Sequence, residues 1–281
     1  KICVVGGGYW GKNHIKTLND MGCLFSIVEK DNELLDYYKQ QYSNVKLFSS
    51  LEDSLQSNFV DGYVVATPAE THFDIAKKII INNKSVLVEK PFVLNMDDAV
   101  ELKRLSIHHN VNVMVGHVML FHPAITKIKE ILDSGEIGEL RYIYSNRLNF
   151  GIVKNKENVF WSLSTHDIAL FQYFSGSKIK SFDINGKAML QNNIHDSVVA
   201  YFEYENGIHS HIFSSWLHPF KEHKMVFIGE EGMISFHDSD DPKTLKLYLK
   251  KMDLQNNKIE KIEKIEKNIS FLNDQPLKRE L

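Results

Sequence analysis

The sequence predicts an α/β fold in two parts, and three observations indicate it. Over residues 1–119, short β-branched runs alternate with helical patterns, which is typical of βαβ units and of a doubly wound parallel sheet. Over residues 120–281, longer alternating runs separated by turns predict an α+β domain with a large, mainly antiparallel open sheet. A chain of 281 residues also suits two ordinary domains better than one.

Parallel strands that are buried on both faces read as short continuous apolar runs, and the first part contains several of them. They lie at residues 2–5, 24–28, 62–66, 85–88 and 111–115. Helical patterns at residues 71–81 and 96–108 stand between strands, as a doubly wound order requires.

The second part opens with a helical pattern at residues 124–133, which ends at Ser134-Gly135. Strands are then predicted at residues 140–148, 178–190, 197–204, 208–216, 225–228 and 245–251. Residues 256–267 repeat Lys-Ile-Glu, a charge run interpreted as a solvated strand or hairpin edge. An open sheet needs its outer face covered, so we expect a homodimer or homotetramer joined through this sheet.

The composition argues against several classes of partner. A formal net charge of -3 provides no attraction for nucleic acid or for a membrane surface, and no apolar run is long enough to span a bilayer. The two cysteines, Cys3 and Cys23, adjoin apolar runs, which favours a reducing cytoplasm over a disulfide framework. The histidines are scattered without metal-ligand spacing, so no metal site is predicted. A small-molecule partner is expected.

The first predicted strand leads directly into a glycine-rich turn, GGGYWG at residues 6–11, and a helical pattern follows. In such a turn Gly6 permits the tight bend, Gly8 lets backbone amides approach a pyrophosphate, and Gly11 lets the helix pack on the sheet. Anionic phosphate then binds at the positive helix N-terminus, beside Tyr9 and Trp10. The pattern predicts a Rossmann dinucleotide site, and the alternative is a strand-to-helix turn without a ligand.

An acidic residue ends the second predicted strand. Glu29 follows the glycine run at the spacing that lets a carboxylate accept hydrogen bonds from both ribose hydroxyls of an adenosine. Because the same charge repels a 2′-phosphate, NAD is predicted over NADP. Lys30 softens this repulsion, and Asp31 is a second candidate for the ribose contact.

Two further segments follow predicted strands, at the edge of the sheet where ligand crevices form. One reads ATPAETH at residues 66–72, and the other reads VEKP at residues 88–91. Together with the glycine run and Gly116-His117, these motifs resemble those of the Gfo/Idh/MocA oxidoreductases, and the resemblance extends over essentially the whole chain. The resemblance implies a cofactor site that also includes Thr67, Pro68, His72, Glu89, Lys90 and His117.

The same resemblance implies that Lys90 lies beside the nicotinamide ribose and the reacting hydroxyl, with Glu89 and Pro91 fixing its backbone. An ammonium there is chemically reasonable, because it stabilises the alkoxide that develops as hydride leaves a carbinol carbon. A solvated lysine at a strand end is the alternative.

The segment WSLSTHD at residues 161–167 resembles the family's Asp-x-x-x-His segment, whose histidine acts as general base. His166 occupies that position, and an imidazole can exchange a proton near neutral pH. Ser162 stands where the family has aspartate. Either His166 works without a carboxylate partner, or Asp167 orients it from the other side. A histidine that satisfies helix-terminal hydrogen bonds is the structural alternative.

Strand alternation within residues 142–151 places Arg147 and Asn149 on one face, where an arginine fork suits a diphosphate but equally suits an exposed strand charge. With Ser162 and His166, these residues resemble the substrate site of bacterial sugar-nucleotide 3-dehydrogenases. The resemblance implies NAD-dependent oxidation of the third-carbon hydroxyl of a UDP-sugar, followed by an aminotransferase that serves lipid A or surface polysaccharide.

UDP-N-acetylglucosamine is favoured over its uronic acid, because no basic residue is reserved for a carboxylate. Two rivals remain: a dehydrogenase of another sugar or polyol such as inositol, and a non-catalytic NAD-binding sensor or assembly protein. The pair of Lys90 and His166 argues against the second rival, while Ser162 keeps it open.

Overall fold

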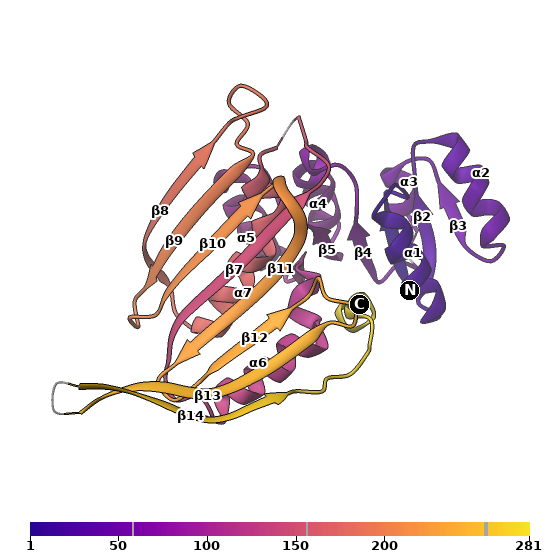
Figure 1. Cartoon of the computed structure of the whole chain (residues 1–281). Coiled ribbons are helices and arrows are strands. Elements are labelled where there is room, and N and C mark those ends of the chain that lie inside the picture. Colours follow the sequence, from indigo (N-terminus) through magenta and orange to yellow (C-terminus); the bar gives the residue numbers. More distant parts are fainter. Residues whose placement is uncertain (58, 156, 256–257) are drawn as a thin grey trace. The chain divides into compact units, whose positions relative to one another are not determined.

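A six-stranded parallel sheet organises the first part of the chain, in the order β3-β2-β1-β4-β5-β6 (Figure 1). The computed structural model describes residues 1–57, 59–155, 157–255 and 258–281. The strands are β1 (Ile2–Val5), β2 (Leu24–Val28), β3 (Lys46–Phe48), β4 (Gly62–Val65), β5 (Ser85–Glu89) and β6 (Val113–Gly116). The predicted parallel sheet is confirmed. The pattern did not predict β3, because a three-residue strand has no apolar run of its own.

Helices cover both faces of this sheet, because its apolar strands are buried on both sides. Alternate residues of β1 pack into different clusters: Val4 lies with Ile15 of α1, whereas Cys3 and Val5 lie with Ile79 of α4. The helices of this part are α1 (Gly11–Asp20), α2 (Asn32–Gln41), α3 (Leu51–Leu55), η1 (Ala69–Thr71), α4 (His72–Ile81) and α5 (Met96–His109).

An eight-stranded sheet organises the second part, in the order β14-β13-β12-β11-β7-β10-β9-β8 (Figure 1). Strands β7 and β10 run parallel and the other neighbouring pairs run antiparallel, so the predicted mainly antiparallel sheet is confirmed. The strands are β7 (Leu140–Phe150), β8 (Ile179–Lys187), β9 (Ser197–Tyr204), β10 (His209–Ser215), β11 (Leu217–Gly229), β12 (Met233–His237), β13 (Thr244–Gln255) and β14 (Lys258–Asn268).

One face of the second sheet is covered by α6 (Pro123–Asp133) and α7 (Thr165–Ser175), which Figure 1 shows behind the strands. Ile125 of α6 and Phe171 of α7 are fully buried in one cluster with Ile143 and Phe227 from the sheet. Two short turns precede these helices: η2 (Val118–Phe121) and the π-helical η3 (Phe160–Ser164). Within the described residues, no helix combines the length and apolar character that a bilayer crossing needs.

Several strand boundaries of the second sheet differ from the sequence prediction. Strand β11 begins at Leu217, well before the predicted 225–228. The sequence pattern missed its first part because Pro219 interrupts the apolar run there, and the pairing with β7 shifts register over the same residues. Strand β12 was not predicted. Strand β14 pairs with β13, which confirms the strand interpretation for most of residues 256–267, while residues 256–257 lie outside the described residues.

The chain divides into two compact units, Lys1–Val118 with Leu277–Leu281, and Met119–Pro276. The final helix, α8 (Pro276–Glu280), therefore ends in the first unit, and Leu281 packs on the cluster that contains Ile15. Glu280 is 8% exposed, and its carboxylate oxygens have no hydrogen-bond partner among the described residues. Burial raises the pKa of Glu280 to about 8, and the charge of Glu89 adds to the rise.

This buried acid predicts how stability changes with pH. Since the folded-state pKa lies above the model-compound value of 4.5, the folded form binds more protons between about pH 4.5 and pH 8, and stability falls as the pH rises through that window. Glu280→Gln should flatten this fall and raise Tm at pH 8.5 by about 4 °C, the shift that about 1–2 kcal/mol produces in a domain of this size. Calorimetry across the pH range measures it, with the exposed turn residue Glu205→Gln as control. Parallel pH profiles for the wild type and Glu280→Gln would contradict it.

Candidate functional site

Steric limits explain the glycines in the turn between β1 and α1. Gly6 has a φ of +93°, in the left-handed region that favours glycine. A Cβ on Gly11 would lie 1.9 Å from the Gly6 carbonyl oxygen, so no larger residue fits there. A Cβ on Gly8 would meet nothing within 4 Å, so the backbone at Gly8 is open to a ligand. This open backbone stands at the N-terminus of α1, where a pyrophosphate binds in such folds.

A cavity of about 780 Å³ lies beside this turn, within the first unit. The predicted cofactor residues that line it are Gly6, Gly8, Tyr9, Trp10, Glu29, Thr67 and Pro68. Leu34, Leu51 and Ile75 add apolar walls. A cavity of this size, mostly apolar with a few polar groups, fits the nucleoside and phosphate parts of NAD.

Glu29 stands at the end of β2 on the wall of this cavity. Its Oε2 accepts a hydrogen bond from Gly7 N at 2.6 Å, and its Oε1 accepts from Lys30 N at 2.7 Å and Asp31 N at 3.1 Å. These backbone donors hold the carboxylate in place. Asp31 instead caps α2, because its Oδ1 accepts from Glu33 N at 2.8 Å. Of the two ribose candidates, Glu29 is therefore the one that has no helix to cap.

His72 ties together the two loops that follow β4 and β5. Its ring is 1% exposed, with Nδ1 2.9 Å from the Pro91 carbonyl oxygen and Nε2 2.9 Å from the Thr67 carbonyl oxygen. Both ring nitrogens are thus engaged with backbone. The geometry favours an indirect role for His72, which positions the Thr67 and Lys90 loops, over the direct cofactor contact that the sequence predicted.

Glu89 is a buried anchor for the loop that carries Lys90. Its Oε1 accepts a hydrogen bond from Trp10 Nε1 and lies 2.7 Å from His14 Nε2, and its Oε2 accepts from Lys90 N at 3.1 Å. Burial lowers the pKa of His117, with Glu89 opposing and Lys90 adding to that change, so these charges act on one another. Glu89 fixes the backbone of Lys90, and His14 is a partner that the sequence prediction missed.

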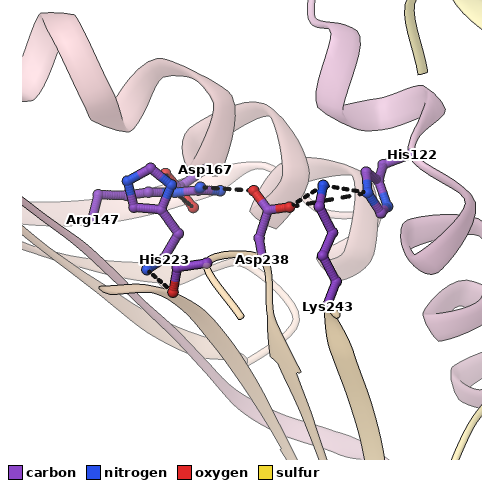
Figure 2. A network of polar contacts seen from close by, with 7 residues as sticks. His122, Arg147, Asp167, His223, Asp238 and Lys243 are labelled. Atoms are coloured by element: carbon purple, nitrogen blue, oxygen red, sulfur yellow. Dashed lines mark hydrogen bonds and ion pairs between the residues drawn. The ribbon is translucent and has the colours of Figure 1, made fainter. Parts of the chain in front are cut away.

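The second unit buries an arginine. Arg147 on β7 is 7% exposed, and its Nε donates to Asp167 Oδ1 at 3.0 Å and Oδ2 at 2.8 Å (Figure 2). Asp167 is 0% exposed and belongs to the first turn of α7, directly after His166. Burial raises the pKa of Asp167, and the Arg147 guanidinium opposes that rise.

This ion pair continues into a chain of polar contacts (Figure 2). Asp238, between β12 and β13, lies 3.9 Å from Arg147 Nη1 and 2.6 Å from Lys243 Nζ. Lys243 Nζ in turn lies 3.1 Å from Nε2 of His122, the residue that caps α6 through its Nδ1. Burial alone would raise the pKa of Asp238, but Lys243 and Arg147 hold it below its usual value. We call Arg147, Asp167, Asp238, Lys243 and His122 the charged network.

His223 on β11 lies directly opposite Arg147 of β7. Burial, and then the charges of Arg147 and Lys221, lower the pKa of His223 to about 4, so its imidazole is neutral at physiological pH. Because the neutral ring adds no positive charge beside Arg147, it does not repel the guanidinium, whose charged partners are Asp167 and Asp238.

These contacts correct the sequence interpretation of β7 and α7. Arg147 is buried, so it is not an exposed strand charge, and its contact with a diphosphate stays a prediction. The Asp167 carboxylate pairs with Arg147 through both of its oxygens. Burial alternates along β7 until Arg147 and Leu148 are both buried, so alternation does not decide the side of the half-buried Asn149.

Ser162 lies in η3 and His166 in the first turn of α7 that follows it. A π-helical turn is rare and often marks a functional site. Ser164 Oγ, at the end of η3, lies 2.5 Å from Ser214 Oγ of β10, which ties this turn to the sheet. The sequence carries no signal for Asp238 or Lys243, because HDSDDPK reads as an ordinary polar turn.

In comparisons with known proteins, each unit matches a domain of the same oxidoreductase family. Residues 1–117 match the family described as "Oxidoreductase family, NAD-binding Rossmann fold", and residues 125–235 match the GFO/IDH/MocA C-terminal domain. A scyllo-inositol 2-dehydrogenase (NAD(+)) of Bacillus subtilis is 27% identical over 191 residues, which cover 64% of this chain and 56% of that protein. An inositol 2-dehydrogenase of Corynebacterium glutamicum is 20% identical over 74% of this chain and 64% of its own length. The chain thus spans less than two thirds of these relatives.

Solved structures share the fold. A UDP-N-acetylglucosamine 3-dehydrogenase, GnnA from Acidithiobacillus ferrooxidans, superposes with a TM-score of 0.84 at 20% identity, over 99% of this chain and 85% of that one. The WlbA dehydrogenase from Bordetella pertussis, in complex with NADH and UDP-GlcNAcA, superposes with a TM-score of 0.76 at 20% identity, over 84% of this chain and 73% of that one. From its two matched domains, the chain is a member of the Gfo/Idh/MocA family of oxidoreductases, with an NAD-binding Rossmann domain followed by the family's C-terminal domain.

Proposed function

We propose that this chain is an NAD-dependent dehydrogenase that oxidises the third-carbon hydroxyl of a UDP-sugar, with UDP-N-acetylglucosamine favoured. The observation that carries the proposal is the dinucleotide cavity of the first unit, walled by Glu29 and by Trp10, whose indole donates to the Glu89 carboxylate that also accepts from the Lys90 amide. The coarser function, a sugar or polyol dehydrogenase that uses NAD, follows from the family.

Oxidation of a secondary alcohol removes a hydride from carbon and a proton from oxygen. NAD, when held in the cavity beside Glu29, would supply the hydride acceptor. In this proposal the Lys90 ammonium stabilises the developing alkoxide, and the His166 imidazole accepts the hydroxyl proton and returns it in the reverse direction. Ser162 supplies a hydrogen-bonding hydroxyl where relatives have a carboxylate.

The sugar-nucleotide substrate is supported by the fold shared with GnnA over 99% of this chain. The uronic acid is the second candidate, because WlbA is solved with UDP-GlcNAcA. A polyol is the third, because the inositol dehydrogenases match in sequence. The product of the favoured reaction is a 3-keto sugar nucleotide, whose carbonyl an aminotransferase can convert to an amine. A non-catalytic NAD-binding sensor remains the rival from another class.

A substrate panel separates these candidates. UDP-N-acetylglucosamine, its uronic acid and scyllo-inositol are each incubated with NAD, with an aminotransferase coupled to the sugar nucleotides to remove the ketone, and NADH absorbance is read. Turnover of UDP-N-acetylglucosamine is expected, and His166→Asn should lower kcat by about 10²–10⁴-fold, the usual contribution of a general base. Lys90→Met should lower kcat by at least as much, whereas Lys103→Met, at an exposed position of α5, should leave kcat unchanged. Full activity in His166→Asn would remove it as the base.

The cofactor preference is tested at Glu29. Glu29→Ala should weaken NADH binding by about tenfold, the effect of losing one hydrogen bond to a charged group, and should reduce discrimination against NADPH. Fluorescence titration of both reduced cofactors measures it, with Glu33→Ala on α2 as the matched control. A wild type that prefers NADPH, together with unchanged NADH binding in Glu29→Ala, would defeat the assignment.

We also propose that copies of this chain associate through the outer face of the second sheet. On that face the His211 ring stacks on the Tyr144 ring, with 5.1 Å between the ring centroids. Tyr142 Oη lies 2.7 Å from His211 Nδ1. Tyr201 beside them is 51% exposed. Light scattering should give a dimer or tetramer, and Tyr201→Lys should shift it toward the monomer by placing charges in the contact. A wild-type monomer would contradict the proposal.

A further inference from the structure

The first turn of α7 is held by a contact that the mechanism does not use. Asp167 is fully buried one residue after His166, and both of its carboxylate oxygens lie within 3.0 Å of Arg147 Nε. Arg147 comes from β7, a central strand of the sheet. The pair therefore ties the first turn of α7, which carries His166, to the sheet.

Apart from His122, the charged network consists of two cations and two carboxylates. Arg147 and Lys243 are positive, Asp167 and Asp238 are negative, and the neutral His223 ring adds no charge beside them. Lys243 reaches Asp238 at 2.6 Å from the strand that follows it, so the second carboxylate has its own cation. The shorter contact of Arg147 is thus with Asp167, at 2.8 Å against 3.9 Å for Asp238.

A buried ion pair of this kind is a poor device for stability alone, since well-packed apolar residues of similar volume often stabilise as much. What the pair adds is a fixed attachment, because both Asp167 oxygens lie within hydrogen-bond distance of Arg147 Nε. In this chain an attachment next to His166 has a use, because the residue one turn earlier is Ser162, which carries no charge.

We propose that Arg147 and Asp167 are positioning residues, whose ion pair sets the first turn of α7 and thereby the direction of the His166 imidazole. The proposal rests on the proposed function only in naming His166 as the base. The anchoring of the turn itself stands on the Arg147–Asp167 geometry and is measured separately.

The test uses an apolar replacement of the whole pair. Arg147→Met with Asp167→Leu removes both charges and leaves neither one buried alone, unlike Arg147→Met by itself. Arg147→Lys keeps the positive charge without the planar fork. Arg141→Met is the matched control, because Arg141 lies on the same strand and pairs with Glu230 at an exposed position. Each variant is compared by Tm, by hydrogen–deuterium exchange over residues 163–169, and by kcat, KM and NADH binding.

In the double variant, Tm and NADH binding should stay near wild type, exchange in the first turn of α7 should quicken, and kcat should fall by about 10–100-fold with KM unchanged, as for a misplaced catalytic group. Arg147→Lys should lose kcat likewise without unfolding, which keeps the test decisive if the double variant does not fold. Arg141→Met should match the wild type.

Unchanged exchange and unchanged kcat in a folded double variant would overturn the proposal and leave the pair as a structural contact. A raised KM with unchanged kcat would also overturn it, because Arg147 would then bind substrate directly. Absence of turnover by the wild type on the whole substrate panel defeats the proposed function instead, while the exchange result still decides whether the pair anchors the turn.

Discussion

A buried carboxylate is stabilised either by a proton or by donors inside the protein. Glu280 has a raised pKa and no hydrogen-bond partner among the described residues, whereas Glu89 of the first unit and Asp167 of the second are held by donors. In the first unit, the Glu89 carboxylate accepts hydrogen bonds from Trp10 Nε1 and the Lys90 amide and lies 2.7 Å from His14 Nε2. In the second, Asp167 collects the Arg147 guanidinium. Lys90 directly follows Glu89, and His166 directly precedes Asp167, so each proposed catalytic residue is the chain neighbour of a paired, buried carboxylate.

In this arrangement one residue anchors the backbone and its chain neighbour is assigned the chemistry. The anchoring carboxylate binds backbone or a neighbouring element, and the proposed chemistry is assigned to the adjacent residue. Removing a partner from such a pair typically costs about 3–5 kcal/mol, because the remaining charge stays buried without compensation. Both anchors therefore combine a stability requirement with a positional one, and the two effects separate only when the whole pair is replaced.

Local patterns predicted much of this molecule. The parallel sheet followed from apolar runs, and the need for glycine at Gly6 and Gly11 followed from turn geometry, which depends on residues adjacent in the chain. Spacing from the glycine run placed Glu29 at a strand end, and motif resemblance placed Glu89 and Lys90 at another. It did not show that His72 spans two loops, or that Asp31 caps a helix, because hydrogen-bond partners depend on which loops come together.

The sequence by itself determined the family, the cofactor fold and the strand ends at which the first unit presents its polar residues, since periodicity, glycine spacing and motif order are all written in neighbouring residues. Only the tertiary structure decided that Arg147 is buried, that Asp167 turns toward it, and that Asp238 and Lys243 join them. The physical reason is that the free energy of a charge depends on its burial and its partners, and both come from strands and helices distant in sequence.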